Sequence, residues 1–152
     1  MATITFREAT VADTAALARL RWEMERERKG GDLSLEDYTH AYIAATKAEM
    51  ERGAHQAWIA EAGGEAVACV LLVWWMLPPN FENLARKRGF VSSVYTQPAY
   101  RRQGIARRLM GLLVERARAD GVLRLVLWAS DMGRPLYLDM GFTPSRGLEL
   151  DF

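Results

Sequence analysis

The chain has 152 residues, of which 50% are hydrophobic and 26% charged, which excludes the disordered, collagen-like and coiled-coil classes. The formal net charge is +1, so no global field draws the protein to nucleic acid or to an anionic membrane, and any basic site must be local. One cysteine, Cys69, and two histidines cannot build an internal disulfide or a Cys/His metal site. We expect one domain over residues 1–152.

The N-terminal residues show no targeting signal, because no apolar segment follows a basic one. The longest apolar run, residues 66–77, is shorter than the ~18 residues that span a bilayer, and it is expected to be a buried strand. Together with the cysteine count, these features predict a cytoplasmic protein.

The first half of the chain predicts one strand, two helices and a hairpin. Residues 3–7 alternate between polar and apolar, as in a short strand. Helices are expected over about residues 11–29 and 34–52, each opened by Ser or Thr with Asp three residues later. Strands over residues 57–60 and 66–76 flank a Gly-Gly turn and form an antiparallel pair.

The second half predicts a strand over residues 90–96 and an amphipathic helix over about residues 103–119. A dense apolar strand follows over residues 122–128, and a short helix with Pro135 in its first turn comes next. One or two β segments are expected in residues 142–152. The order is β-α-α-β-β-β-α-β-α-β, which predicts an α+β chain, a mixed sheet covered by helices.

The segment from Val94 to Arg108 runs from a strand end through a turn into a helix, and its chemistry suits an anion. The first backbone N–H groups of a helix lack an intrahelical partner, and the small Gly104 and Ala106 let a ligand approach them closely. Four arginines surround the turn: Arg101, Arg102, Arg107 and Arg108. An ordinary helix start with solvated arginines would have the same spacing, so both interpretations stay open.

Two other phosphate-binding motifs do not fit this segment. A P-loop needs Gly-Lys followed by Ser or Thr, which the turn lacks. A dinucleotide fingerprint needs a third small residue where Leu109 stands, and further βαβ units where fewer than fifty residues remain. Both motifs are therefore excluded.

Residues 101–106, Arg-Arg-Gln-Gly-Ile-Ala, resemble the signature of the GNAT superfamily of N-acetyltransferases, Arg/Gln-x-x-Gly-x-Gly/Ala at a helix start. Residues 128–142 look like the family's segment in which a helical tyrosine, here Tyr137, precedes a Gly-Phe pair. The resemblance covers essentially the whole chain, although residues 10–55 match only in their type of structure. It implies the GNAT fold, a mostly antiparallel mixed sheet with helices on both faces.

The resemblance implies an acetyl-CoA site at this turn. The pyrophosphate would lie on the backbone amides of residues 102–107, and the pantetheine alongside the strand edge, in a cleft where two neighbouring strands splay apart. At Ser130 the family often carries Asn. The implied cofactor-binding residues are Val94, Tyr95, Thr96, Arg101, Arg102, Gln103, Gly104, Ile105, Ala106, Arg107 and Ser130.

The implied activity is acetyl transfer from acetyl-CoA, without a metal, to a primary amine of a small molecule or peptide by direct attack. In that family the position of Tyr137 holds the phenol that protonates the departing thiolate. The amine must lose a proton to a base or ordered water, and the oxyanion needs a donor such as a strand N–H. Cys69, inside an apolar run, is expected to be a buried side chain and not a nucleophile.

The family architecture would line the acceptor pocket with the first two helices and the loop at residues 77–90. The candidates are Trp22, Glu23, Glu25, Trp75 and Glu82. Core packing of Trp75 and a solvated helix face for the glutamates would also explain these residues.

Two alternatives stay open at this point. The chain would be either a GNAT enzyme that uses another acyl-CoA, or a non-catalytic acyl-CoA-binding or regulatory module in which Tyr137 only packs. Neither nucleic acid nor a membrane is an expected partner, and a homodimer is left open.

Overall fold

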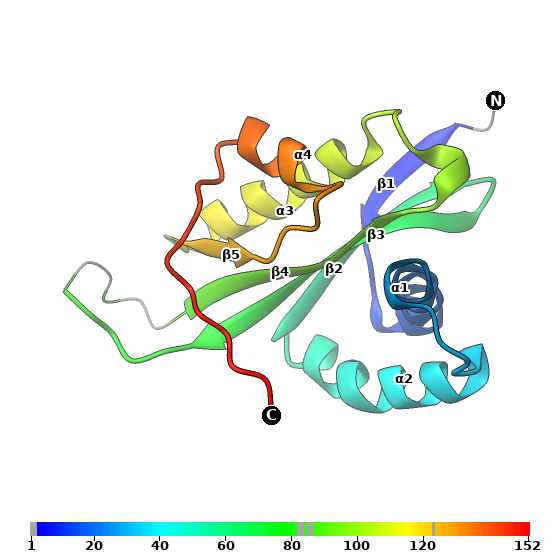
Figure 1. Cartoon of the computed structure of the whole chain (residues 1–152), viewed down its shortest axis with the longest axis horizontal. Helices are drawn as coiled ribbons and strands as arrows, with labels where there is room; N and C mark the ends of the chain where they lie inside the picture. Colours follow the sequence, from blue (N-terminus) through cyan, green and yellow to red (C-terminus); the bar gives the residue numbers. More distant parts are fainter. Residues whose placement is uncertain (1–2, 82–83, 85–86, 123) are drawn as a thin grey trace.

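The computed structural model describes residues 3–81, 84, 87–122 and 124–152, and its centre is a five-stranded sheet (Figure 1). The strands are β1 (Ile4–Glu8), β2 (His55–Ala62), β3 (Glu65–Met76), β4 (Lys87–Thr96) and β5 (Leu125–Leu127). They lie in the order β1-β2-β3-β4-β5; the first three pairings are antiparallel, and β4 pairs with β5 in parallel. The predicted mixed, mostly antiparallel sheet is confirmed.

Helices cover both faces of the sheet, as predicted (Figure 1). The helices are α1 (Thr14–Lys29), α2 (Leu35–Glu51), α3 (Ile105–Ala119) and α4 (Arg134–Asp139), with 3-10 turns at Val11–Asp13 and Pro98–Tyr100. The helices α1 and α2 lie on one face, and α3 and α4 on the other. None of the described helices is long and apolar enough to cross a membrane.

The sheet separates two apolar cores. On β3, Val70 and Leu72 belong to the core beneath α3, whereas Cys69 and Leu71 belong to the core beneath α1. Successive strand residues point to opposite faces, so a strand covered on both faces is apolar at every position. This explains why the apolar run predicted as one buried strand forms β3.

β4 separates from β5 halfway along its length. The two strands pair only at Gly89, Phe90 and Val91 of β4, and the rest of β4 has no β5 partner in the described part of the chain. Just beyond, Ser93 has a φ of 55°, and the register against β3 shifts between its residues 69 and 71. This bulge bends β4 and leaves the edge of residues 92–96 open.

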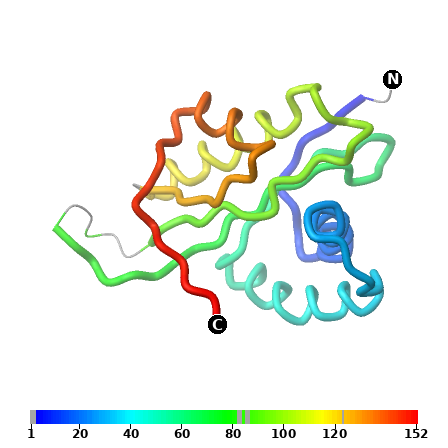
Figure 2. Tube along the Cα trace, viewed as in Figure 1, coloured from blue at the N-terminus to red at the C-terminus, as the bar shows by residue number. Residues whose placement is uncertain are grey.

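The β segment expected in residues 142–152 is wrong, because the structure has no strand there. Leu148, Leu150 and Phe152 alternate with polar residues, but they are all exposed, and the tail runs away from α4 (Figure 2). Pro144 cannot donate to a ladder, and alternation alone supplies no partner strand.

Two strand boundaries also differ from the prediction. β4 begins at Lys87, so the loop that precedes it is shorter than residues 77–90, and the Lys87 ammonium lies 3.8 Å from the centre of the Trp74 ring. β5 is only three residues long within the predicted strand of residues 122–128.

Candidate active site

The turn between β4 and α3 has an unusual backbone. Arg102 has a φ of 63° and Gly104, the N-cap of α3, a φ of 76°. Alternating left-handed residues direct successive N–H groups to one side, which forms an anion-binding concavity. A Cβ built on Gly104 would meet nothing within 4 Å, so the space in front of the turn is open. The turn therefore suits a phosphate group.

Arg101 fixes this turn against α1. Its Nε donates to the Thr96 carbonyl at 2.9 Å, and its Nη2 donates to Glu27 Oε2 at 2.6 Å. The guanidinium also lies 5.7 Å from the centre of the Tyr95 ring. The hydrogen bond from Arg101 lowers the pKa of Glu27. Because its Nε and Nη2 are engaged in this way, Arg101 helps to fix the shape of the turn.

Of the other three arginines of the segment, one forms an ion pair within the protein and two are exposed. Arg107 pairs with Asp139 and so links α3 to α4. Arg102 and Arg108 are exposed and form no ion pair with the described residues. These two side chains are the cations that remain available to an anionic ligand at the turn.

Replacing Arg102 separates its charge from its backbone conformation. We expect Arg102→Ala and Arg102→Gly to weaken acetyl-CoA binding equally, by about 1–3 kcal/mol, because both remove the guanidinium. Arg102→Gly should be more stable than Arg102→Ala by about 1 kcal/mol, because only glycine adopts a φ of 63° without strain. Calorimetry and thermal unfolding measure the two effects. Arg118→Ala, at the far end of α3, is the control, and an unchanged affinity in both Arg102 variants would contradict the assignment.

The open edge of β4 carries the side chains expected to lie along the pantetheine. Val94 packs against the core beneath α3, and Tyr95 is buried in the core beneath α1. The Thr96 hydroxyl is buried and has no hydrogen-bond partner in the described structure. A buried polar group without a partner is destabilising, so an unpartnered hydroxyl at this edge suits a ligand amide.

Thr96→Val tests this hydroxyl through two effects of opposite direction. The free protein should gain about 1 kcal/mol, because valine keeps the shape and removes an unpartnered group. Acetyl-CoA affinity should fall by roughly 5- to 10-fold, the worth of one hydrogen bond. Thr46→Val is a matched control, because the buried Thr46 hydroxyl donates to Tyr42 O at 2.6 Å and its loss should be destabilising. If Thr96→Val binds acetyl-CoA as tightly as the parent protein, the Thr96 hydroxyl does not contact the ligand.

Tyr137 lies on α4 and is 8% exposed. Its ring packs edge-on against Phe142, with centroids 6.0 Å apart, and belongs to the core against which Val94 packs. Its hydroxyl donates to no group among the described residues. Burial raises the pKa of Tyr137 to about 12. The phenol is therefore protonated and free to donate at neutral pH.

Ser130 helps to shape the turn before α4. Its Oγ accepts a hydrogen bond from Gly133 N at 3.1 Å, and its carbonyl accepts one from Arg134 N at 2.9 Å. A Cβ on Gly133 would lie 3.0 Å from the Tyr137 ring and 3.3 Å from Ser130 Oγ. These contacts position Tyr137, and they engage the Ser130 hydroxyl within the protein.

Two of the acceptor candidates lie together. Trp22 and Glu25 line a hollow of about 460 Å³ formed by the second half of α1, the loop that follows and Tyr38; we call it the α1 hollow. The indole Nε1 of Trp22 donates to Leu33 O at 2.8 Å, which fixes the loop against the helix.

The other candidates lie elsewhere. Glu23 accepts a hydrogen bond from Gln97 Nε2 at 3.0 Å and does not line the α1 hollow. Trp75 lines a different hollow of about 690 Å³ near the end of β3 and stacks on Phe90, with ring centroids 5.0 Å apart. Glu82 lies outside the described residues. The structure thus does not join the five candidates into one pocket.

Sequence reasoning missed Arg21. Its Nη1 donates to Ser92 Oγ at 2.8 Å and Ser93 Oγ at 2.7 Å, at the bulge of β4, and its Nη2 lies 3.3 Å from Glu25 Oε1. A signal was present, because helical spacing puts Arg21 on the same face of α1 as the apolar stripe. That stripe consists of Leu17, Leu20 and Met24.

Cys69 is confirmed as a buried side chain. Its thiol donates to Ser93 O at 3.3 Å, and burial raises its pKa to about 12. A thiol with this pKa carries almost no thiolate at neutral pH. The described residues also contain no group of three or more His, Cys, Asp or Glu that could hold a metal ion.

Comparison with known proteins identifies the family. The sequence profile of the Acetyltransferase (GNAT) family matches residues 14–142. Glucosamine 6-phosphate N-acetyltransferase of Trypanosoma brucei brucei is 31% identical over 77 residues, 50% of this chain and 52% of that protein, so the chain spans about half the length of this relative.

Two solved structures are similar along their whole length. A GCN5-related N-acetyltransferase from Ralstonia eutropha JMP134 is 26% identical, with a TM-score of 0.87 over 99% of both chains. A predicted acetyltransferase with acetyl-CoA from Clostridium acetobutylicum is 25% identical, with a TM-score of 0.84 over 98% of this chain and 96% of that one. The chain therefore belongs to the acetyltransferase (GNAT) family, which confirms the predicted fold and the acyltransferase class.

Proposed function

We propose that this chain transfers an acetyl group from acetyl-CoA to an amine by direct attack of the amine on the thioester. The observation that carries the proposal is the open edge of β4, which runs directly into the left-handed turn at Arg102 and Gly104. A strand edge with free backbone groups suits the amides of pantetheine, and the turn suits a pyrophosphate. Membership of the GNAT family supports the same assignment.

The residues of this chain fit acetyl-CoA at two points. The unpartnered Thr96 hydroxyl and the backbone of β4 would hold the pantetheine, and the amides of residues 102–107 would hold the pyrophosphate. When bound, acetyl-CoA supplies an activated acyl group. A backbone N–H at the open edge of β4 would stabilise the negative charge that develops on the carbonyl oxygen.

Tyr137 is the proton donor in this proposal. The amine nitrogen forms a bond to the acyl carbon, the carbon–sulfur bond breaks, and the amine proton leaves to solvent or a base. Tyr137 gives its phenolic proton to the departing sulfur and recovers one from solvent. Burial makes Tyr137 a weaker acid than an ordinary phenol, but burial in the same core also raises the proton affinity of a thiolate.

A thiol-release assay with acetyl-CoA and a panel of amines tests the proposal. The name of the Trypanosoma relative puts glucosamine 6-phosphate in the panel, beside aminoglycosides and peptides. Release with at least one amine supports the proposal. If calorimetry shows that acetyl-CoA binds but no amine causes release of the thiol, a non-catalytic module is favoured instead. A higher kcat/KM with another acyl-CoA would mean that this other acyl-CoA is the acyl donor.

A further inference from the structure

The α1 hollow has an excess of positive charge. Four cationic side chains line it, Arg21, Arg26, Arg28 and Lys29, together with one carboxylate, that of Glu25. The whole chain carries a formal net charge of only +1. The hollow is therefore locally positive although the chain as a whole is nearly balanced in charge.

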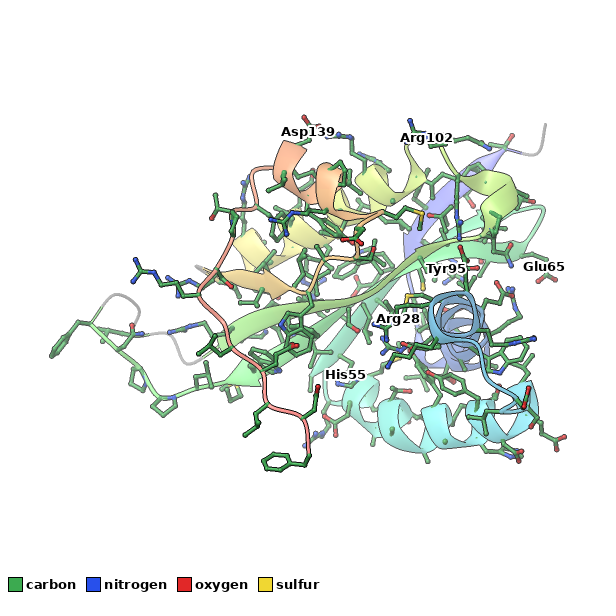
Figure 3. The ribbon with its side chains drawn as sticks, in the orientation of Figure 1. Arg28, His55, Glu65, Tyr95, Arg102 and Asp139 are labelled. Atoms are coloured by element: carbon green, nitrogen blue, oxygen red, sulfur yellow. The ribbon has the colours of Figure 1, made fainter. Side chains whose placement is uncertain are left out.

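Arg21 connects one wall of the α1 hollow to the splayed part of β4. Arg21 lines the hollow, and its guanidinium donates to the hydroxyls of Ser92 and Ser93 at 2.8 and 2.7 Å. These two serines directly follow Val91, the last β4 residue that pairs with β5. Figure 3 shows Arg28 and Tyr95 on the α1 side of β4. Through Arg21, the hollow is thus linked to the part of β4 that has separated from β5.

The carboxylate of Glu25 does not neutralise the cations around it. It is shared between Arg21, at 3.3 Å, and Arg28, at 3.0 Å. Arg26 stacks on the Trp22 ring with its guanidinium carbon 4.6 Å from the ring centre, and Lys29 forms no ion pair with the described residues. Donors on several of these side chains therefore remain available.

Helix polarity explains only part of this arrangement. Cations in the last turn of a helix stabilise its negative end, and Arg26, Arg28 and Lys29 lie in the last turn of α1. Arg21 lies about two turns earlier and is half-buried, with its guanidinium turned to the β4 bulge.

We propose that the acceptor amine carries an anionic group, a phosphate or a carboxylate, which Arg28 binds in the α1 hollow while the amine faces β4. The inference rests on the proposed transferase function and assigns the chemistry of its acceptor. A volume of about 460 Å³, with Trp22 and Tyr38 as aromatic walls, suits a small molecule. A bidentate arginine is the side chain best matched to either anion.

Matched pairs of amines test the proposal. Glucosamine 6-phosphate is compared with glucosamine, and β-alanine with its amide. The effects of a phosphate and of a carboxylate on kcat/KM are thus measured separately. We expect kcat/KM to be at least 30-fold higher for the anionic member of one pair, and the difference to shrink with added salt. Equal values within both pairs, or a preference for the neutral members, would overturn the inference while leaving the transferase function intact.

Direct binding keeps the test independent of turnover. With CoA present, calorimetry should give tighter binding of glucosamine 6-phosphate or β-alanine than of the neutral partner. A protein that binds acetyl-CoA and the anionic amine but releases no thiol would contradict the transferase proposal and support the anion site. A protein that binds no anionic amine better than its neutral partner would contradict the anion site.

Charge variants identify the side chains. Arg28→Gln should raise KM for the preferred anionic amine about 10-fold and leave KM for acetyl-CoA unchanged, whereas Arg118→Gln, in the last turn of α3, should change neither. Glu25→Gln removes the carboxylate of the hollow and should lower that KM several-fold. An unchanged KM in Arg28→Gln, or a raised KM in Glu25→Gln, would overturn the assignment.

Discussion

Gly104→Val is expected to abolish acetyl-CoA binding, with a loss in affinity of at least roughly 100-fold. A φ of 76° is rarely adopted by residues with a side chain, and least by β-branched ones. A Cβ at this position would enter the open space in front of the turn, where nothing lies within 4 Å. A bulky side chain would therefore keep a phosphate away from the backbone N–H groups.

Gly121→Val is the matched control for Gly104→Val. Gly121 follows the other end of α3 with a φ of 73°, and its added Cβ also meets nothing within 4 Å. Both variants should lose about 1–2 kcal/mol of stability from backbone strain, but only Gly104→Val should lose affinity. Isothermal calorimetry measures both affinities. If Gly104→Val binds acetyl-CoA as tightly as the parent protein, the assignment is wrong. Equal losses of affinity in Gly104→Val and Gly121→Val would mean that backbone strain causes both losses.

Local chemistry explains why much of the fold could be predicted. Thr10 with Asp13 and Ser34 with Asp37 stand at helix starts, and the Ser34 hydroxyl accepts from Asp37 N at 3.1 Å as expected. The open edge of β4 could not be predicted in the same way. It depends on the bulge at Ser93 and on where β5 stops pairing, which are set by contacts between distant segments.

In the predicted site, too, the residues of the turn could be read from the local sequence, whereas their contacts with distant residues could not. The segment at residues 101–107 is contiguous, so its glycine and arginines are visible in the sequence. The partners of its arginines are not, because Arg101 binds Glu27, 74 residues away, and Arg107 binds Asp139, 32 residues away. Only the fold reveals which cations are already engaged, and the roles of these residues in acetyl-CoA binding stay predictions.

The acceptor side was the least predictable part. Sequence reasoning grouped Trp75 with Trp22 and Glu25 from expected family architecture, whereas the structure separates them into two hollows. Arg21 escaped notice because an arginine beside a solvated run of charged residues resembles a surface residue. Its bonds to Ser92 and Ser93 arise from the packing of α1 against β4, which no local pattern encodes.

Tyr137→Phe is expected to lower kcat by roughly 10²- to 10⁴-fold and to leave acetyl-CoA affinity nearly unchanged. The substitution removes only the hydroxyl, and the ring keeps its edge-on contact with Phe142. Because the hydroxyl has no partner among the described residues, its loss leaves no protein group unsatisfied. The variant should therefore fold normally, and any loss of rate reports on proton transfer.

Tyr42→Phe is the matched control for Tyr137→Phe. Tyr42 is also 8% exposed, but it lies on α2 in the core beneath α1. Burial raises the pKa of both phenols, so the two variants remove hydroxyls from similar environments. We expect kcat to change only in Tyr137→Phe. A similar loss of kcat in Tyr42→Phe would mean that altered packing, and not a missing proton donor, lowers kcat in Tyr137→Phe.

Single-turnover kinetics and the pH dependence of the parent enzyme complete the test of Tyr137. A pKa raised to about 12 keeps the phenol protonated well above the range in which an ordinary tyrosine ionises, near pH ~10. The chemical step should therefore lose no activity between pH 8 and about pH 10.5 through deprotonation of this donor, and Tyr137→Phe should be slow across that whole range. If the single-turnover rate constant of the variant equals that of the parent enzyme, Tyr137 only packs and water protonates the thiolate. A fall in the rate of the parent enzyme with an apparent pKa near ~10 that disappears in Tyr137→Phe would mean instead that ligand binding exposes the phenol to water.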